Sequence, residues 1–482
     1  MTTLREYQQT AIDQLRANIM QGKKRLILCS PTGAGKTVMF SYMVAAALQK
    51  GKRCIIFTDR IELLRQADGS LARFNIAASL IEASKGSIAP DAACYIAMAQ
   101  TFIRRKANPA YADLLNAMDL VIIDEAHKQT FNNLLDLINP NAVVIGATAT
   151  PLRRGKQTCL SQFYQNLINP VQVSELIQLG FLSDPVSFGT QIDLSGIAMK
   201  GDDYDTSQMA QRYSERKVYA GVLSNYSRLC DRKKAIVFAS NIASSQEICD
   251  AFQMAGYPAR HVDGEMSKKE RAAVLRWFKN SPDGILCNCD LMTTGYDEPT
   301  IEVVILYRAT ASLPLFMQMV GRGSRVTETK KRFIILDFGN NIQSHGYWEQ
   351  DREWSLKKKQ IRKKAGVAGV KSCPNCEALI PPSTRVCKYC GQIIEQKPKD
   401  PPPVAELQLL TKADGMKLAK NADIAAKAKL AKAKVISPFW VLHNCKSKDE
   451  ALQFVSLMGW KKGWLFHNAK RFKIFASSDG RV

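Results

Sequence analysis

This 482-residue sequence lacks any apolar run long enough to span a membrane, and its first ten residues lack the apolar core of a signal peptide. We therefore predict a cytoplasmic protein with no membrane partner. Short-period internal repeats are also absent, which argues against a solenoid. Nine of the 13 cysteines follow no regular spacing, and we interpret them as reduced thiols of an intracellular protein.

Acidic residues are too few to balance the basic ones. The chain has 67 Lys and Arg against 44 Asp and Glu, a formal net charge of +23. Residues 351–482 alone hold 27 basic and 11 acidic side chains, so most of the excess lies in this C-terminal part. A basic region attached to a nearly balanced body favours nucleic acid as the partner over a merely solvated surface.

Short runs rich in Val and Ile alternate with helical patterns in two tracts of the chain. Continuous runs of this kind are typical of parallel strands that are buried on both faces. The runs are 26–29, 54–57, 119–124 and 142–148 in the first tract, and 235–240, 284–287, 302–307 and 333–338 in the second. We therefore predict two α/β domains in tandem, joined by a polar segment.

The segment Ser30–Thr37, SPTGAGKT, lies between an apolar run and a helical pattern. A strand, a Gly-containing loop and a helix in this order can surround a polyphosphate with backbone N–H groups. Lys36 would then reach the β- and γ-phosphates, and the Thr37 hydroxyl would hold Mg²⁺. Ser30 stands where the strict pattern has glycine, and an ordinary turn between a strand and a helix is the alternative.

Two carboxylates, Asp124 and Glu125, follow the apolar run 120–123. Ligands of α/β proteins bind at the carboxyl ends of the parallel strands. Beside a phosphate-binding loop, Asp124 can hold Mg²⁺, and Glu125 can orient or deprotonate a water that attacks the γ-phosphate. A solvated strand end is the alternative for such a pair taken alone.

Seven segments, in the same order as in the family, resemble the motifs of superfamily 2 helicases. For motifs I, Ia, II, III, IV, V and VI they are SPTGAGKT (30–37), DRIELLRQ (59–66), DEAH (124–127), GATATP (146–151), IVFAS (236–240), LMTTGYDEP (291–299) and QMVGRGSR (318–325). The resemblance implies two RecA-like parallel-sheet domains. It also implies a DEAH-type ATP hydrolase that uses ATP and Mg²⁺ to unwind nucleic acid or to translocate along it.

The resemblance further assigns roles to single residues. The catalytic set is Lys36, Asp124, Glu125, Arg322 and Arg325. The two arginines would act from the second domain as arginine fingers, which are worth about 10³–10⁵ in rate. The nucleotide-binding set is Arg5, Gln8, Thr32, Gly33, Ala34, Gly35, Lys36, Thr37, Asp297 and Gln318. The set that couples hydrolysis to domain motion is His127, Thr148 and Thr150, and the nucleic-acid contacts are Arg60, Gln100, Thr101, Thr293 and Thr294.

Four cysteines do have a regular spacing. Cys373, Cys376, Cys387 and Cys390 form two C-x2-C pairs with ten residues between them. Four thiolates in this arrangement are typical of a closed structural zinc site. Two disulfides or a redox pair are the alternatives, and a reducing compartment disfavours both. A segment of about 20 residues has too small a core to fold without the metal.

A helicase motor followed by such a cysteine module resembles bacterial RadD-type DNA repair helicases and their phage-encoded relatives, most closely over residues 293–325. The resemblance implies an action on single-stranded, forked or branched DNA in repair, recombination or replication. It implies a single-stranded DNA-binding protein or recombination factors as partners. An RNA helicase, a duplex translocase and an ATP-switched nucleic-acid-binding protein remain alternatives.

The end of the chain interleaves tryptophans with basic residues, in GWKKGWLFHNAKRFK (459–473). Aromatic stacking combined with phosphate neutralisation holds single strands without sequence preference, so we predict DNA contacts at Lys461 and Lys462. For the tryptophans, the core of a small domain is the favoured interpretation.

The composition shifts along the chain predict seven parts. They are a first RecA-like domain (1–183), a connecting segment (184–215), a second RecA-like domain (216–345), a basic linker (346–371), a zinc ribbon (372–392), a Pro-rich linker (393–410) and a basic, aromatic C-terminal region (411–482).

Overall fold

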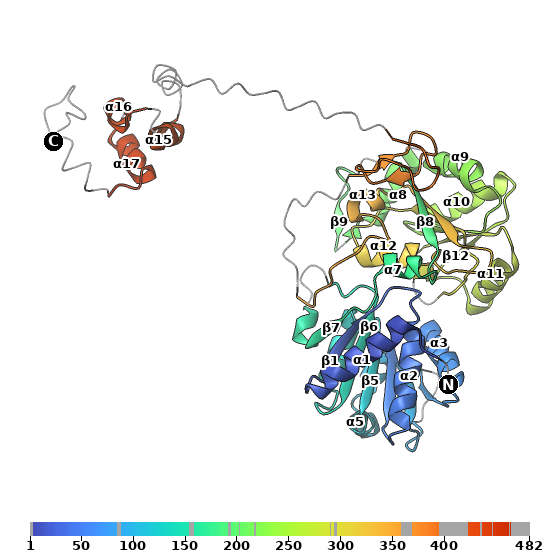
Figure 1. The fold of residues 1–482 in the computed structure, drawn as a ribbon. Helices are drawn as coiled ribbons and strands as arrows, with labels where there is room; N and C mark the ends of the chain where they lie inside the picture. Colours follow the sequence, from blue (N-terminus) through green and yellow to red (C-terminus); the bar gives the residue numbers. More distant parts are fainter. Residues whose placement is uncertain are drawn as a thin grey trace. The chain divides into compact units, whose positions relative to one another are not determined.

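The computed structural model describes residues 3–83, 88–153, 159–190, 194–201, 203–215, 218–289, 291–293, 296–357, 369–394, 423–433, 436–445, 447–461 and 463. The chain divides into two compact units, Met1–Glu395 and Gln396–Val482. The first unit contains two α/β domains (Figure 1). No helix in the described ranges is long and apolar enough to cross a lipid bilayer.

The first domain is built on a parallel sheet with the strand order β3-β4-β2-β5-β6-β1-β7. Its strands are β1 (Arg25–Cys29), β2 (Cys54–Thr58), β3 (Ser79–Ile81), β4 (Cys94–Met98), β5 (Leu120–Asp124), β6 (Val143–Thr148) and β7 (Asn166–Ile168). The four predicted strands are confirmed, and β3, β4 and β7 extend the sheet on either side. All five residues of β2 are buried, as expected for a central strand of a parallel sheet.

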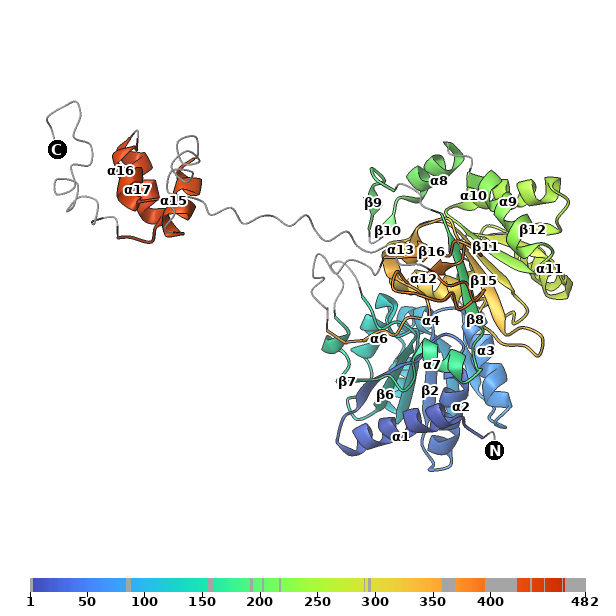
Figure 2. The ribbon, with the colours of Figure 1, turned by 45° about the horizontal axis from the view of Figure 1, so that its top comes forward.

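Helices cover both faces of this sheet (Figures 1 and 2). They are α1 (Glu6–Met20), α2 (Lys36–Leu48), α3 (Ile61–Ala72), α4 (Ala99–Arg104), α5 (Pro109–Asn116) and α6 (Asn132–Leu135), with short 3₁₀ turns η1 (Gln129–Phe131) and η2 (Leu160–Gln162). The next helix, α7 (Val173–Gln178), packs Val173 and Leu176 into the core of the second domain instead. Side chains of one strand alternate between two apolar cores, with Ile55 and Phe57 in one and Cys54 and Ile56 in the other.

The second domain contains a parallel sheet with the strand order β12-β13-β11-β14-β15-β8. The strands are β8 (Asp184–Gly189), β11 (Ala235–Ala239), β12 (Ala259–Val262), β13 (Ile285–Asn288), β14 (Val303–Tyr307) and β15 (Arg332–Asp337), while β9 (Met199–Lys200) and β10 (Asp203–Tyr204) form a small ladder of their own. The helices are α8 (Thr206–Glu215), α9 (Val218–Cys230), α10 (Ile242–Met254), α11 (Lys268–Asn280), α12 (Leu313–Val320) and α13 (Asn341–His345), with the 3₁₀ turn η3 (Leu291–Thr293). The predicted fold class, two RecA-like α/β domains, is confirmed.

The segment 184–215, expected to be only a connection, supplies a strand instead. Asp184–Gly189 forms β8, which pairs in parallel with β15 at the edge of the second sheet. Along β8 the side chains on one face of the sheet are buried and those on the other face are partly exposed. The sequence of this strand therefore contains no continuous apolar run. Pro185 also obscures the strand, although proline is tolerated at a sheet edge.

The segment expected to begin a basic linker at 346 packs against both domains instead. Trp348 is fully buried in the second domain, where its indole Nε1 donates to Met317 O (3.2 Å). Further along, Trp354 and Leu356 pack against the core of the first domain, and Ser161 N donates to Leu356 O (3.2 Å). We call residues 346–357 the crossing segment; it passes from the second domain to the first in both views (Figures 1 and 2).

The cysteine module contains a short antiparallel ladder of β16 (Lys371–Ser372) and β17 (Leu379–Ile380). In the C-terminal unit, α15 (Ile424–Lys432), α16 (Pro438–His443) and α17 (Lys448–Leu457) enclose a small apolar core. Trp460 packs on this core, with its ring centroid 6.5 Å from that of Phe454. The core interpretation of the tryptophans is therefore confirmed for Trp460.

Candidate active site

Three adjacent strands of the first sheet end at one place. β6 lies between β1 and β5, with Cys29 paired to Thr148 and Asp124 paired to Ala147. The loop after β1, the hydroxyl at the end of β6 and the carboxylates at the end of β5 therefore emerge side by side. The order of the strands in the sheet thus brings together residues that lie far apart in the sequence: the phosphate loop, the two carboxylates and the predicted coupling residues.

The loop Ser30–Thr37 adopts the backbone that its glycines permit. Gly33 (φ +90°) and Gly35 (φ +78°) lie in the left-handed region, where a side chain would be strained. Gly35 is the residue before α2, which begins at Lys36. The loop thus leads directly into a helix N-terminus, the feature that favours anions through its free N–H groups and its dipole.

Lys36 lies against its own loop, and its Nζ donates to Ser30 O (3.1 Å) and Pro31 O (3.3 Å). Burial lowers the pKa of Lys36, while the carboxylates of Glu125 and Asp124 oppose this shift. The lysine and both acids are therefore close enough to interact, as a phosphate and metal site requires.

The two carboxylates are held in an unusual local conformation. Glu125 has φ +53°, a left-handed value that is uncommon for residues other than glycine and costs about 1–3 kcal/mol. Its backbone N–H donates to Asp124 Oδ1 (3.0 Å). Burial, followed by the nearby Glu125 charge, raises the pKa of Asp124 to about 7. Glu125 Oε2 is buried and accepts no hydrogen bond among the described residues.

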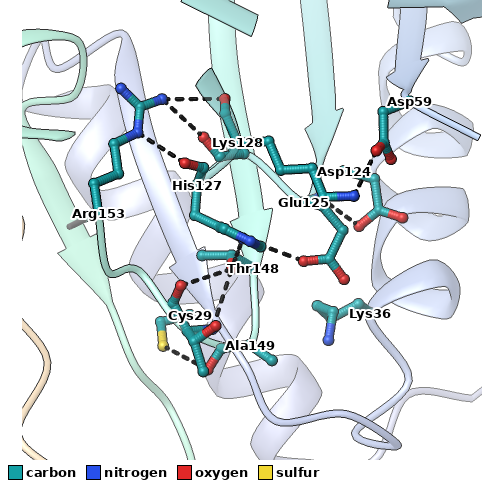
Figure 3. A network of polar contacts seen from close by, with 12 residues as sticks. Cys29, Lys36, Asp59, Asp124, Glu125, His127, Lys128, Thr148, Ala149 and Arg153 are labelled. Atoms are coloured by element: carbon teal, nitrogen blue, oxygen red, sulfur yellow. Dashed lines mark hydrogen bonds and ion pairs between the residues drawn. The ribbon is translucent and has the colours of Figure 1, made fainter. Parts of the chain in front are cut away.

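A chain of polar contacts connects these acids to β6 (Figure 3). Glu125 Oε2 lies 3.3 Å from His127 Nδ1, and His127 Nδ1 lies 2.8 Å from Thr148 Oγ1. Thr148 Oγ1 in turn accepts from Thr150 N (3.1 Å). Burial lowers the pKa of His127, which favours the neutral imidazole. The three residues predicted to couple hydrolysis to motion therefore form one network with Glu125.

Two supports of this network were missed in the sequence. Arg153 donates from Nε to His127 O (2.8 Å) and from Nη2 to Lys128 O (3.3 Å), so it clamps the backbone after the carboxylates (Figure 3). Lys128 Nζ lies 2.5 Å from Asp59 Oδ2, which joins the ends of β5 and β2. The position of Arg153 just after GATATP was the available signal.

The N-terminal residues lie on the phosphate loop. Gln8 is buried, and its Nε2 donates to Ala34 O (3.1 Å) while its Oε1 accepts from Arg5 N (3.0 Å). Tyr7 Oη also donates to Ala34 O (2.9 Å), a contact that the sequence did not indicate. The Arg5 guanidinium lies 3.9 Å from the centroid of the Phe181 ring. Arg5 and Gln8 therefore lie beside the loop they are predicted to serve.

The second domain meets the phosphate loop through the segment after α12. A Cβ added to Gly321 would lie 3.1 Å from Thr32 Cβ, and one added to Gly33 would lie 2.7 Å from Leu182 Cδ2. Leu182 pairs with Arg325 in an isolated β-bridge, and Ser183 Oγ donates to Arg325 O (2.9 Å). The loop Gly321–Arg325, which we call the arginine loop, thus lies directly against the first domain's phosphate loop.

Each arginine of this loop is engaged within its own domain. Arg322 Nη1 donates to Tyr296 O, and Arg325 Nε lies 3.2 Å from Asp297 Oδ1. Burial, followed by the Arg325 charge, lowers the pKa of Arg322 to about 10, while the Glu125 carboxylate opposes this shift. Both arginines therefore act electrostatically on the first domain's site, since Arg325 also lowers the pKa of Lys36.

The remaining nucleotide candidates lie at the same junction. Gln318 is buried on α12, and Thr32 lies under Gly321. Thr37 is the second residue of α2, and its carbonyl oxygen accepts from Ser41 Oγ (3.0 Å). A cavity of about 840 Å³ lies elsewhere, lined by Arg25, Tyr164, Trp354 and their neighbours, and it shares no residue with this junction.

The predicted nucleic-acid contacts are only partly described. Arg60 precedes α3, and its Nη1 donates to Leu291 O (3.4 Å), which joins the first domain to η3. Gln100 and Thr101 lie on α4 at the end of β4. Thr293 ends η3, but its side chain, Thr294 and Lys462 lie outside the described residues, while Lys461 is exposed in the C-terminal unit.

The four regularly spaced cysteines converge. Their Sγ atoms all lie within 4.8 Å of one another, with Cys373 and Cys390 3.7 Å apart and Cys376 and Cys387 3.7 Å apart. Two equivalent turns present them, in which Glu377 N donates to Cys373 O and Gly391 N donates to Cys387 O (both 2.9 Å). The backbone N–H of Gln392 lowers the pKa of the Cys390 thiol to about 6, which favours a thiolate.

This cysteine module is anchored on the edge strand β8. Tyr389 Oη donates to Pro185 O (3.0 Å), and Lys388 Nζ lies 3.5 Å from Asp184 Oδ1. Leu379 joins the apolar core of the second domain, and a Cβ on Gly189 would lie 3.1 Å from its Cδ1. The module therefore covers an edge that would otherwise present unpaired backbone groups.

Two protein families match the chain. Residues 1–153 match the family described as "Type III restriction enzyme, res subunit", and residues 222–327 match the one described as "Helicase conserved C-terminal domain". The two matches cover the α/β domains that carry the phosphate loop and the arginine loop.

Individual proteins are similar over larger parts of the chain. A 51.5 kDa protein of Lactococcus phage (isolate 7-9) is 29% identical over 424 residues, which cover 84% of this chain and 89% of that protein. IRC3 of Saccharomyces cerevisiae, named as a candidate ATP-dependent helicase, is 29% identical over 357 residues, which cover 70% of this chain and only 51% of that protein. A solved fragment assigned to an HsdR subunit of a type I restriction enzyme from Vibrio vulnificus YJ016 has 28% identity and a TM-score of 0.56, covering 71% of this chain and 67% of that one.

Proposed function

We propose that this chain, which belongs to the superfamily 2 helicases and hydrolyses ATP, acts on single-stranded or branched DNA and separates its strands. The observation that carries the proposal is the contact between the phosphate loop and the arginine loop. Hydrolysis at a junction of two domains can change how the domains pack, and such a change can be transmitted to a bound strand.

We assign the steps of hydrolysis to the residues at this junction. Lys36 and the N–H groups of residues 32–37 bind the phosphates, and Arg5 and Gln8 contact the base. Glu125 Oε2, which accepts no hydrogen bond among the described residues although His127 Nδ1 lies 3.3 Å away, orients the attacking water and accepts its proton. Arg322 and Arg325 stabilise the charge that develops on the γ-phosphate.

One residue at the start of α2 and one at the end of β5 are suited to a magnesium ion. Thr37 and Asp124 supply a hydroxyl and a carboxylate, the oxygen ligands that Mg²⁺ prefers. The raised pKa of Asp124 supports the assignment, since a carboxylate crowded by a second carboxylate is a place where a cation is favourable. When bound, Mg²⁺ would neutralise the negative charge of the phosphates.

Zinc is the metal that we propose for the four cysteines. Thiolate ligands at this mutual distance suit a tetrahedral site with Zn–S bonds of about 2.3 Å. In the described structure all four thiols already converge, and no disulfide joins them. The metal would hold together a module that has only Cys373, Ile380, Cys387 and Ile394 as its buried core.

DNA is favoured as the substrate by charge and by the comparisons. The C-terminal part of the chain holds most of the excess of basic residues, and a polyanion is the partner that such a region attracts. Restriction enzyme subunits are among the similar proteins. We place the activity in cytoplasmic DNA repair, recombination or replication, with a single-stranded DNA-binding protein as the expected partner.

Strand separation on a labelled DNA fork tests the proposal. We expect ATP-dependent release of one strand, and no release by Lys36→Ala, which should still bind the fork if the basic C-terminal part contributes grip. An RNA fork of the same sequence serves as the comparison. Release from RNA alone would point to an RNA helicase. ATP hydrolysis stimulated by DNA without release from any fork would point to a duplex translocase.

A further inference from the structure

Lys330 is a lysine whose ammonium group lies inside the second domain. The residue is only 6% exposed and stands in the tight turn between the arginine loop and β15. Thr327 N donates to Lys330 O (3.3 Å), and Lys330 N donates to Thr327 Oγ1 (3.0 Å), so the backbone of the turn is closed on itself. Burying an ammonium group is unfavourable unless it is hydrogen-bonded, so its partners are informative.

The Lys330 ammonium group joins two backbone segments. Its Nζ donates to Ile301 O (2.7 Å) and to Gly323 O (2.9 Å). Ile301 follows the segment that carries Asp297, the partner of Arg325, and Gly323 lies between the two arginines. The Lys330 side chain therefore connects the loop that carries Arg322 and Arg325 to the segment that follows Asp297.

The arginine loop is closely packed around Gly323. A Cβ on Gly323 would collide with the Phe333 ring and would lie 2.8 Å from Val304 Cγ2. On its other side the loop is held through Ser183, whose backbone N donates to Ser324 O (2.8 Å). Lys330 supplies the hydrogen bonds from within the domain, and Ser183 supplies them from the segment that leads to the first domain.

We infer that Lys330 is a positioning residue for ATP hydrolysis, which holds the arginine loop so that Arg322 and Arg325 face the phosphate loop. The inference rests on the proposed roles of these two arginines and assigns the orienting role to a side chain outside the ATP site. Two carbonyl groups that point at one ammonium group keep their orientation only while that group can donate to both.

The charge of Lys330 is sensitive to pH in a useful range. Burial lowers the pKa of Lys330 to about 8, the Glu302 and Glu298 carboxylates oppose this shift, and Arg325 adds to it. The ammonium group is charged below this pH and becomes a neutral amine, a weaker donor, above it. We therefore expect kcat to decline as the pH rises through about 8.

The first experiment compares Lys330→Met with Lys331→Met, which removes the neighbouring, exposed lysine. We expect Lys330→Met to lower kcat for DNA-stimulated ATP hydrolysis by about 10- to 100-fold, the range for residues that orient functional groups, with KM for ATP within about twofold. Equal kcat values for the two variants would overturn the inference.

The second experiment measures the pH dependence of kcat in the wild type and in Lys330→Arg. Between about pH 7.5 and pH 9.5, the charged fraction of a group with a pKa near 8 falls from about three quarters to about 3 per cent, so wild-type kcat should fall by up to about 25-fold, the limit in which only the charged form is active. Lys330→Arg keeps its charge and should give a flat profile with substantial activity. A flat wild-type profile, or the same decline in the Arg variant, would contradict the inference.

Failure of the inference is distinguishable from failure of the proposed function. If Arg322→Ala and Arg325→Ala lose activity while Lys330→Met keeps it, only the role of Lys330 is wrong. If the arginine variants keep wild-type kcat, the proposed ATP site itself is wrong.

Discussion

The two α/β domains hold their halves of the proposed ATP site in different ways. In the first domain, Lys36, Asp124 and Thr148 lie at or just beyond the ends of adjacent strands, and His127 joins the carboxylates to β6. In the second domain, the two arginines lie in a loop after α12 and are bonded to partners of their own domain. A sheet orders the first half, and side-chain and backbone contacts order the second.

This difference indicates where the site can be adjusted. The strand ends of the first half have fixed neighbours, so their geometry follows from the fold. The second half depends on contacts that cross between domains, such as Gly321 against Thr32 and the Leu182–Arg325 bridge. We therefore expect substitutions in the first half to remove groups that take part in the reaction, and substitutions around the second half to disturb the alignment of the two domains.

The largest expected effect comes from the second half. Arg322→Ala should lower the rate of ATP hydrolysis by about 10³–10⁵-fold, because the charge on the γ-phosphate loses a stabilising cation. Binding of a fluorescent ATP analogue should persist. Arg332→Ala is the matched control, since its exposed guanidinium pairs only loosely with Asp184 (3.8 Å). Hydrolysis by Arg322→Ala within tenfold of the control would contradict the arginine's role.

The first half should respond strongly to the loss of its base. Glu125→Gln keeps the shape of the side chain and should lower kcat by about 10²–10⁴-fold, the typical contribution of a general base. Nucleotide affinity should remain close to that of the wild type. Glu62→Gln on the exposed start of α3 serves as the control for the loss of one acidic charge. Unchanged kcat in Glu125→Gln would assign the base elsewhere.

The crowded carboxylates should also appear in the stability of the first domain. The pKa of Asp124 is raised to about 7, so its stabilising contribution is present below the unfolded pKa and is lost as the pH rises through about 7. Asp124→Asn should therefore raise the unfolding temperature at about pH 8 without Mg²⁺, because its free energy of unfolding should be higher by up to a few kcal/mol. Near pH 4 the substitution should change the unfolding temperature little. A lower unfolding temperature at pH 8 would show that Asp124 is stabilised as a carboxylate.

Loss of the proposed zinc site in the cysteine module should affect ATP hydrolysis little, in contrast to substitutions in either half of the proposed ATP site. We expect the wild type to contain zinc, measured by atomic absorption, and we expect Cys376→Ser to lose it and to expose residues 371–394 to protease. Tyr389, Lys388 and Leu379 of the module contact β8, which carries none of the proposed ATP-site residues, so kcat should change by less than about threefold. Cys159→Ser is the control. Equal zinc content in the two variants would refute a four-cysteine site.

The smallest effect on hydrolysis is expected from the C-terminal unit. A chain that ends at Glu395 keeps the crossing segment and the cysteine module, and it should hydrolyse ATP normally at saturating DNA. Its DNA affinity should fall, and the slope of log K against log salt should flatten, by about 0.7 for each single-strand phosphate contact removed. An unchanged slope would mean that this unit does not contact DNA.

Much of the site could be predicted from the sequence because its parts are local patterns. The phosphate loop follows a continuous apolar strand, and the carboxylates follow another, so both strand ends and their side chains were recognisable in the one-dimensional chain. The parallel order of the strands then brings them together without further information. The cysteine pairs were recognisable for the same reason.

The rest depends on contacts that leave no pattern. β8 is half-exposed and contains Pro185, so it resembles a connection. Trp348, Trp354 and Leu356 anchor a segment whose other residues are mostly polar, and the basic run that follows it, 357–364, concealed its packing. Arg153 and Lys330 donate to backbone carbonyl groups. Every residue has such a group, so the sequence cannot show which carbonyl accepts these hydrogen bonds.

The most direct measurement is the steady-state rate of ATP hydrolysis with single-stranded DNA, forked DNA and RNA at one salt concentration. An ATP-driven motor that acts on DNA predicts stimulation by DNA, strongest on the preferred structure, and loss of that stimulation in Arg322→Ala. Stimulation by RNA alone, or a stimulated rate that survives the loss of the arginine, would contradict it.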